Sequence, residues 1–166
     1  GVMMINTSWM AGLRRGSRMG TATVEAAIVL PVLLTLLFGM LELGLMARSS
    51  LALGHLGREA VRVAIVGATP TRINSFIGEI SSGINDARLT TTLEYRALDT
   101  DTGTWGSWTP LATGEDGLNI ARSGDQVRVS LQYDYQLASG DLFAVIVGAT
   151  DDNTVPLEAT VVGVRE

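Results

Sequence analysis

The chain has 166 residues, with 12 basic and 17 acidic side chains, one histidine and no cysteine. Nucleic-acid binding depends on neutralising phosphates, so an acidic chain of this kind is a poor candidate and we expect no nucleic-acid partner. The lack of cysteine excludes a disulfide framework, a thiol nucleophile and a thiolate metal site.

The N-terminal segment is basic and ends at a glycine. Arg14, Arg15 and Arg18 precede Gly20, and no acid occurs before Glu25. A secretory signal has its cleavage site after its apolar segment, whereas the glycine and the isolated acid here both precede it. This order is typical of a prepilin leader. Glycine offers no side-chain obstruction to a peptidase and leaves the backbone free, so we predict cleavage directly after it.

An apolar run follows, from Ala26 to Met46, with Glu42 as its one charge. A bilayer core needs about 20 mostly apolar residues in a helix, so this run is long enough to span. Positively charged segments tend to remain in the cytoplasm, so we predict that the N-terminus lies on the cytoplasmic side of the inner membrane and that the C-terminal part is exported. The predicted parts are a leader at residues 1–20, the transmembrane half of a long helix at 21–47, and an exported head at 48–166.

Two acids bracket this span, about 25 Å apart at the helical rise of about 1.5 Å per residue. A charged glutamate in hydrocarbon costs a few kcal/mol, and such residues are normally paired or functional. Cleavage would give Thr21 a new amino group, about one turn from the Glu25 carboxylate or beside that of a neighbouring subunit. We therefore expect Glu25 to pair with a mature N-terminus during assembly. A second interpretation, compatible with the first, is that it caps the start of the helix.

Four further positions in the span are expected to shape or pack the helix. Pro31 removes a backbone donor and predicts a kink, while Gly39 and Gly44 are predicted packing positions for another helix. Glu42 is expected at the outer membrane interface, where it reaches water. The alternative for Glu42 is a partner of a basic group on a neighbouring subunit.

Several short motifs together resemble a known family. The segments Gly20–Ala26 (GTATVEA), Leu30–Pro31 and Phe38–Gly44 (FGMLELG) resemble the N-terminal signature of TadE-like pseudopilins. These are minor pilins of the Flp, or tight-adherence, pilus, a bacterial type IV pilus system. Gly57–Arg62 resembles the end of the same module, so that roughly residues 16–66 are covered. The family commonly has phenylalanine after the glutamate, where this chain has Ala26.

The resemblance implies a non-enzymatic subunit used in pilus assembly. Its implied partners are the prepilin peptidase, other pilin or pseudopilin subunits, the inner-membrane assembly machinery and membrane lipid. The alternative function is an uncleaved single-span protein, anchored in the membrane, whose extracytoplasmic head is a binding module.

Beyond the span the helical period continues, since Leu53, Leu56, Ala60 and Ala64 recur at spacings of three and four. The sequence predicts one helix over about residues 22–66, of which the second half forms the spine of the head. A second helix is predicted from Thr71 to about Ile84, with Thr69 or Thr71 as its cap.

Alternation of apolar and polar residues then replaces the helical period. The resulting predictions are strands at 91–97, 127–135 and 155–164, a turn at 99–103, a short strand bearing Trp105 and Trp108, and a short helix at 142–147. The predicted fold class is α+β and pilin-like, with a small antiparallel sheet packed on the spine. We expect the two tryptophans in the core, and an exposed adhesive patch is the alternative.

No catalytic constellation is predicted, and we expect no enzyme, cofactor or metal site. The single histidine, His55, is placed on the polar side of the spine. No phosphate-binding glycine loop follows a predicted strand, and the sequence contains no His/Glu metal spacing. Asp99–Gly103 resembles a calcium loop only superficially. Its twelfth position holds Pro110 instead of an acid, so we interpret it as a surface turn.

Overall fold

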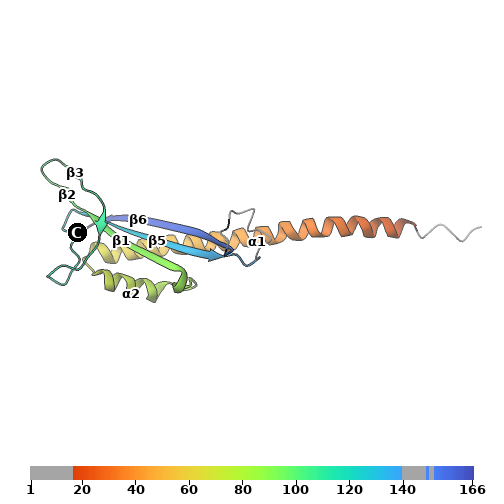
Figure 1. Cartoon of the computed structure of the whole chain (residues 1–166), viewed down its shortest axis with the longest axis horizontal. Helices are drawn as coiled ribbons and strands as arrows, with labels where there is room; N and C mark the ends of the chain where they lie inside the picture. The colour runs from red at the N-terminus through yellow and green to blue at the C-terminus, as the bar shows by residue number, and fades with distance from the viewer. Residues whose placement is uncertain (1–16, 140–148, 150–151) are drawn as a thin grey trace, which may run out of the picture. The chain divides into compact units, whose positions relative to one another are not determined.

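The structure is a computed structural model that describes residues 17–139, 149 and 152–166. The chain divides into two compact units, residues 1–41 and 42–166. The long helix α1 (Ser17–Ile65) contributes to both, and α2 (Pro70–Ile80) and the short 3-10 helix η1 (Asp86–Arg88) belong to the second (Figure 1). The strands are β1 (Leu89–Arg96), β2 (Leu98–Asp99), β3 (Thr104–Trp105), β4 (Thr109–Pro110), β5 (Gln126–Gln136) and β6 (Thr154–Val164).

The described part of the first unit is a single stretch of helix. α1 continues through Pro31 without interruption, and the Thr35 hydroxyl donates to the Pro31 carbonyl oxygen at 2.8 Å. Every large apolar side chain on this stretch is between 41% and 71% exposed. They are Val24, Ile28, Val29, Leu30, Val32, Leu33, Leu34, Leu36, Leu37, Phe38, Met40 and Leu41.

The second unit, which we call the head, is a sheet laid on a helix. Four antiparallel strands in the order β4-β1-β5-β6 lie along α1, and β2 and β3 form a separate hairpin (Figure 1). β5 alternates strictly, with one face buried against the helices and the other turned outward. The core comprises Leu53, Leu56, Ala60, Val61 and Ala64 of α1, Ile73 and Ile77 of α2, Val127, Val129, Leu131, Tyr133 and Tyr135 of β5, and Leu111, Ala121 and Leu137 of the loops.

Two glycines let β6 approach α1 closely. A Cβ added at Gly163 would lie 2.5 Å from Val61 Cγ1 and 2.7 Å from Ile65 Cγ2. A Cβ at Gly57, on the helix, would lie 3.0 Å from Val161 Cγ2. Any side chain larger than hydrogen at Gly163 therefore has to push strand and helix apart.

Distant residues cap the C-terminal end of α1, where the last carbonyl groups of a helix lack partners within it. The Asn119 side-chain amide donates to the carbonyl oxygens of Ala64 (2.8 Å) and Ala68 (3.0 Å). The Arg165 guanidinium donates to the Ile65 carbonyl at 2.9 Å. A cation at this end also suits the helix dipole, so the final residues of the chain hold the end of the first helix.

The structure confirms the predicted fold class, although several boundaries differ. α1 begins at Ser17, five residues before its predicted start, and α2 ends at Ile80 instead of 84. The helix ends earlier, just before Ser81, whose hydroxyl oxygen lies within hydrogen-bonding distance of the Gly78 carbonyl oxygen (3.1 Å) and the Asp86 carboxylate (2.5 Å) and shares its one hydrogen between them. Thr69 is the predicted cap of α2 and accepts from the Arg72 N–H. The predicted short helix at 142–147 lies outside the described residues.

Candidate functional site

The predicted cleavage site lies in the first turns of α1, since the helix begins at Ser17 and includes both Gly20 and Thr21. A Cβ added at Gly20 would meet no atom within 4 Å. The fold of this chain therefore does not require glycine at this position. If glycine is required here, the requirement comes from another molecule that binds this segment.

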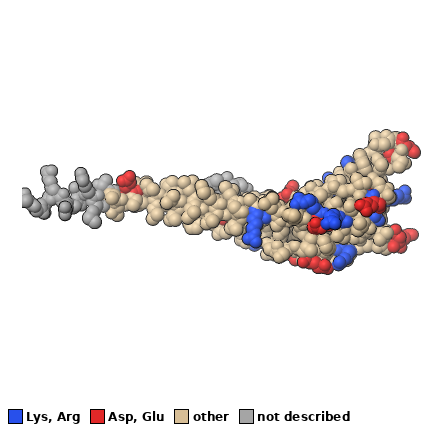
Figure 2. Space-filling model, turned by 180° about the vertical axis from the view of Figure 1, so that it is seen from behind, with Lys and Arg blue, Asp and Glu red and all other residues tan. Residues whose placement is uncertain are grey.

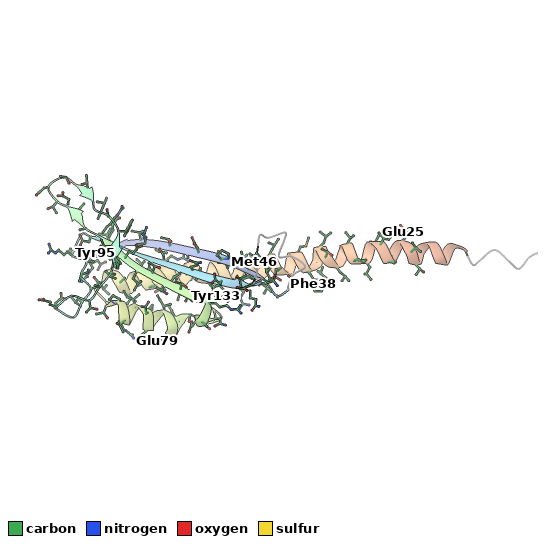
Figure 3. The ribbon with its side chains drawn as sticks, in the orientation of Figure 1. Glu25, Phe38, Met46, Glu79, Tyr95 and Tyr133 are labelled. Atoms are coloured by element: carbon green, nitrogen blue, oxygen red, sulfur yellow. The ribbon has the colours of Figure 1, made fainter. Side chains whose placement is uncertain are left out.

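Glu25 projects from this part of α1, as Figure 3 shows. Its side chain is exposed, and within residues 17–139, 149 and 152–166 no hydrogen bond or ion pair involves its carboxylate. The apolar stretch that follows contains no charge before Glu42, and Figure 2 shows it as an uncharged length of helix. A carboxylate at the start of an apolar segment therefore has to find its partner in another molecule or in water.

The helix that carries Glu25 is long and apolar enough to cross a membrane, by length and composition. Exposed apolar patches of this extent are rare on monomeric soluble proteins and are typical of a protein or membrane interaction site. A single N-terminal apolar helix of this kind indicates membrane anchoring.

Glu42 corrects one expectation, because it does not reach water. Its side chain is only 3% exposed, and each carboxylate oxygen is used. Oε1 accepts from the Tyr135 hydroxyl and the Ala138 N–H, and Oε2 accepts from the Ser139 N–H, all at 3.0 Å. The reason is topological: the chain that leaves β5 returns to α1 here, and its N–H groups find an acceptor in the helix. Glu42 is thus the first residue of the head and fixes the end of β5 to α1.

The remaining predicted positions of the span have no packing partner that the structure defines. Gly44 is exposed, and a Cβ added there would meet nothing within 4 Å, while Gly39 is half-buried. Pro31 lies among exposed apolar side chains. The packing of Gly39 and Gly44 against another helix and the kink at Pro31 stay predictions.

The two tryptophans were expected in the core, and this expectation is wrong. Trp105 is 36% exposed and Trp108 is half-buried, since both belong to the short β3–β4 segment at the rim of the sheet. Their rings pack against the guanidinium of Arg96, at 5.2 Å and 4.6 Å from the ring centres. The sequence offered one signal for this outcome, because the strand pattern around them is too short to bury two indoles.

Two polar features lie at the surface as predicted. His55 is exposed on α1. Asp99 closes the predicted turn: its carboxylate accepts from the N–H groups of Asp101 (2.9 Å) and Thr102 (3.2 Å). Aspartate commonly closes turns in this way, so the segment is accounted for as a hairpin turn between β2 and β3.

A long N-terminal helix, uncovered and apolar in its first part and packed under an antiparallel sheet in its second, defines a class of anchored, pilin-like α+β proteins. Within it, residues 20–62 form a TadE-like domain, since they match the family model described as TadE-like protein. This match confirms the resemblance to the TadE-like family of the Flp pilus system and indicates a Tad pilus-associated protein, structural in kind. The comparison with curated proteins and the comparison with solved structures each return no match.

Proposed function

We propose that this chain is a minor pilin or pseudopilin of the tight-adherence pilus, made as a prepilin and cut after Gly20 by a prepilin peptidase. The observation that supports this most directly is the order of features at the start of α1. A glycine that the fold does not need is followed by an unpartnered acid and then by an uncovered apolar helix. The TadE-like match begins at this glycine.

The pairing of Glu25 gives the cleavage a physical purpose. Cleavage frees a cationic amino group at Thr21, four positions before the glutamate. A carboxylate at the edge of hydrocarbon is stabilised by a nearby cation, because a charge there is otherwise costly. The mature N-terminus of this chain or of an adjacent subunit supplies that cation. In this proposal the uncleaved chain lacks the cation and does not enter the assembly.

The topology in the membrane follows from the charges of the leader. Arg14, Arg15 and Arg18 hold the N-terminus in the cytoplasm, and the head is exported across the inner membrane. In the pilus or at its base, Gly39 and Gly44 face the helices of neighbouring subunits, where small residues permit close approach.

Processing is tested by the intact mass of the chain, recovered from membranes of cells that contain an active prepilin peptidase. We expect a mature N-terminus at Thr21 for the wild type and a retained leader for Gly20→Arg. Gly16→Arg is the matched control, because it adds the same charge within the leader and leaves the cleavage position intact, so it is still cut. If the wild type keeps its first 20 residues while another prepilin in the same cells is cut, the alternative of an uncleaved single-span binding module replaces the proposal.

The pairing of Glu25 is tested separately from the cleavage. We expect Glu25→Gln to be cut normally. After membrane solubilisation, however, it should no longer copurify with the pilus subunits that copurify with the wild type. Glu59→Gln changes an exposed glutamate on the head part of α1, whose one partner is the exposed Arg62, and should copurify unchanged. Equal copurification of Glu25→Gln and the wild type would show that the carboxylate has no part in assembly.

A further inference from the structure

We infer that the outer face of the sheet is a binding surface for a neutral, hydroxyl-rich polysaccharide, with the exposed indole of Trp105 and the half-buried indole of Trp108 at one end and a polar groove beside them. The face in question is the one turned away from α1. Nothing in the proposed pilin role requires an aromatic and hydroxyl-rich surface there, so the inference goes beyond that role.

The first element of the surface is a cluster of two indole rings and two guanidinium groups. The Arg96 guanidinium lies 5.2 Å from the ring centre of Trp105 and 4.6 Å from that of Trp108, and the Arg128 guanidinium lies 4.2 Å from the ring centre of Trp108. The strand register places Arg96 opposite Gln126 and Arg128 opposite Glu94, and both pairs are hydrogen-bonded. These contacts hold the indoles in fixed positions before any ligand arrives, which lowers the entropic cost of binding.

The second element is a shallow groove of about 250 Å³ on the same face. Arg128 belongs to both elements, since it also lines this groove. One row across the sheet consists of Thr92, Ser130 and Thr160, in direct register on β1, β5 and β6. The next row consists of Thr90, Gln132 and Glu158, also in register on the same three strands.

The chemistry of this lining selects the ligand. A hydroxyl group offers one donor and two acceptor lone pairs, and an amide offers both functions as well. A partner that matches such a dense row has to present donors and acceptors at equally short intervals, as the hydroxyl groups of a sugar chain do. The exposed indole supplies a flat surface with a polar edge, which suits the apolar face and the hydroxyl rim of a sugar ring.

The charges on the face favour a neutral chain over an acidic one. On the outward-facing positions of β1, β5 and β6, Arg96 and Arg128 stand with the three carboxylates Glu94, Asp134 and Glu158, and Arg128 is paired with Glu94. A nearly balanced surface gains little from a polyanion. Arg96, whose guanidinium contacts both tryptophans, lies opposite Gln126 at the start of β5, whereas Glu42 binds at the end of β5 through Tyr135. The aromatic end of the surface is therefore remote from Glu42, and the groove extends from it along β5 to Gln132.

The test is affinity electrophoresis of the full chain in a zwitterionic detergent, because a detergent with a sugar head group would compete. Native gels contain dextran, galactomannan or xylan as neutral probes and alginate as the acidic probe. We expect at least one neutral polysaccharide to retard the wild type, equally at 50 mM and 500 mM added salt. Trp105→Ala should weaken that retardation about tenfold, as expected for the loss of one aromatic stacking contact.

Two further variants separate the surface from general effects on folding. The double variant Ser130→Ala with Thr160→Val removes the hydroxyl pair bonded at 3.1 Å and should weaken retardation with an unchanged near-ultraviolet circular dichroism spectrum. The control is Leu51→Ala, which removes a 72% exposed apolar side chain on α1 and should change nothing. The inference is overturned by a lack of retardation in all neutral gels, by retardation in alginate alone that salt abolishes, or by equal losses in Leu51→Ala.

Discussion

The two parts of α1 differ in how their apolar side chains are distributed around the helix and in what surrounds them. Up to Leu41 the large apolar side chains surround the helix on all sides and are at least 41% exposed. From Leu53 onward they form one stripe, and Leu53, Leu56, Ala60 and Ala64 are at most 4% exposed. A helix that is apolar all round needs an external apolar environment, whereas a stripe can be covered by the chain's own sheet. Whether the apolar side chains surround the helix or form one stripe thus decides whether the chain's own sheet can cover them.

This comparison predicts that truncating a leucine has its largest effect inside the stripe. Leu53→Ala removes a fully buried side chain and should lower the free energy of unfolding of the head by about 2 to 5 kcal/mol. The measurement is denaturant unfolding of the full chain in detergent, followed by tryptophan fluorescence. Leu51→Ala, two residues away and 72% exposed, and Leu33→Ala, in the first unit, are the controls and should leave the midpoint unchanged. Comparable losses in all three would mean that the two parts of the helix do not differ as described.

A second prediction concerns the close contact between helix and strand, which the first unit lacks. Gly163→Ala places a Cβ 2.5 Å from Val61 Cγ1, so we expect a loss of about 1 to 3 kcal/mol in the same unfolding assay. The matched control is Gly78→Ala in α2, where a Cβ meets nothing within 4 Å and alanine is the better helix former, by up to about 1 kcal/mol. Opposite signs are therefore expected for the same substitution. A neutral Gly163→Ala would show that β6 can move away from α1 at little cost.

Periodicity in the sequence accounts for most of the fold, because each predicted element has one apolar face. The spacing of Leu53, Leu56 and Ala60 predicted the spine, and the alternation of β5 predicted the buried face of the sheet. Local chemistry predicted Thr69 or Thr71 as the cap of α2, and Thr69 is the one that caps it. The glycine, acid and apolar order at the start of the chain predicted the TadE-like segment. Each of these signals consists of residues that lie close together in the sequence.

The features that the sequence did not predict depend on residues far apart in the chain. Glu42 meets donors that lie 93 to 97 positions away, and no local pattern shows which distant N–H group returns to a helix. Asn119 caps a helix that ends 54 positions before it. The exposure of Trp105 and Trp108 depends on where the short strands β3 and β4 pair. Strands of two residues leave almost no periodic signal in the sequence.

Glu42 is the first residue of the second unit, and its substitution measures how much its hydrogen bonds stabilise the head. Glu42→Gln keeps one acceptor oxygen but turns an NH2 group toward the N–H donors of Ala138 or Ser139, so a buried donor loses its partner. We expect a loss of about 1 to 3 kcal/mol in the stability of the head and faster hydrogen exchange at these two amides. Glu79→Gln, at an exposed ion pair on α2, is the control and should alter neither quantity. Unchanged exchange at both amides would show that Glu42 does not fix the end of β5 to α1.

The smallest expected effect is a pH dependence that belongs to the head alone. Burial, together with the hydrogen bond to the Glu42 carboxylate, raises the pKa of Tyr135 to about 12. A tyrosine in the unfolded chain has a pKa of about 10. Because the folded-state pKa is the higher one, the stabilisation that Tyr135 contributes is complete below pH 10 and declines as the pH rises toward 12. At pH 11 the loss should be about 1 kcal/mol, the value of one pKa unit of linkage, reduced by whatever water reaches the site.

The variant Tyr135→Phe isolates this contribution, because it keeps the ring in the core and removes the ionisable hydroxyl. At pH 8 it should be less stable than the wild type, since Glu42 loses one donor, and the difference between the two should shrink between pH 10 and 12. Urea unfolding monitored by tryptophan fluorescence at a series of pH values measures that difference directly. The exposed apolar helix of the first unit contains no tyrosine, so its anchoring should be unaffected over the same range. A difference that stays constant with pH would mean that the phenol titrates alike in the folded and unfolded chain, and that its contact with Glu42 does not favour the neutral form.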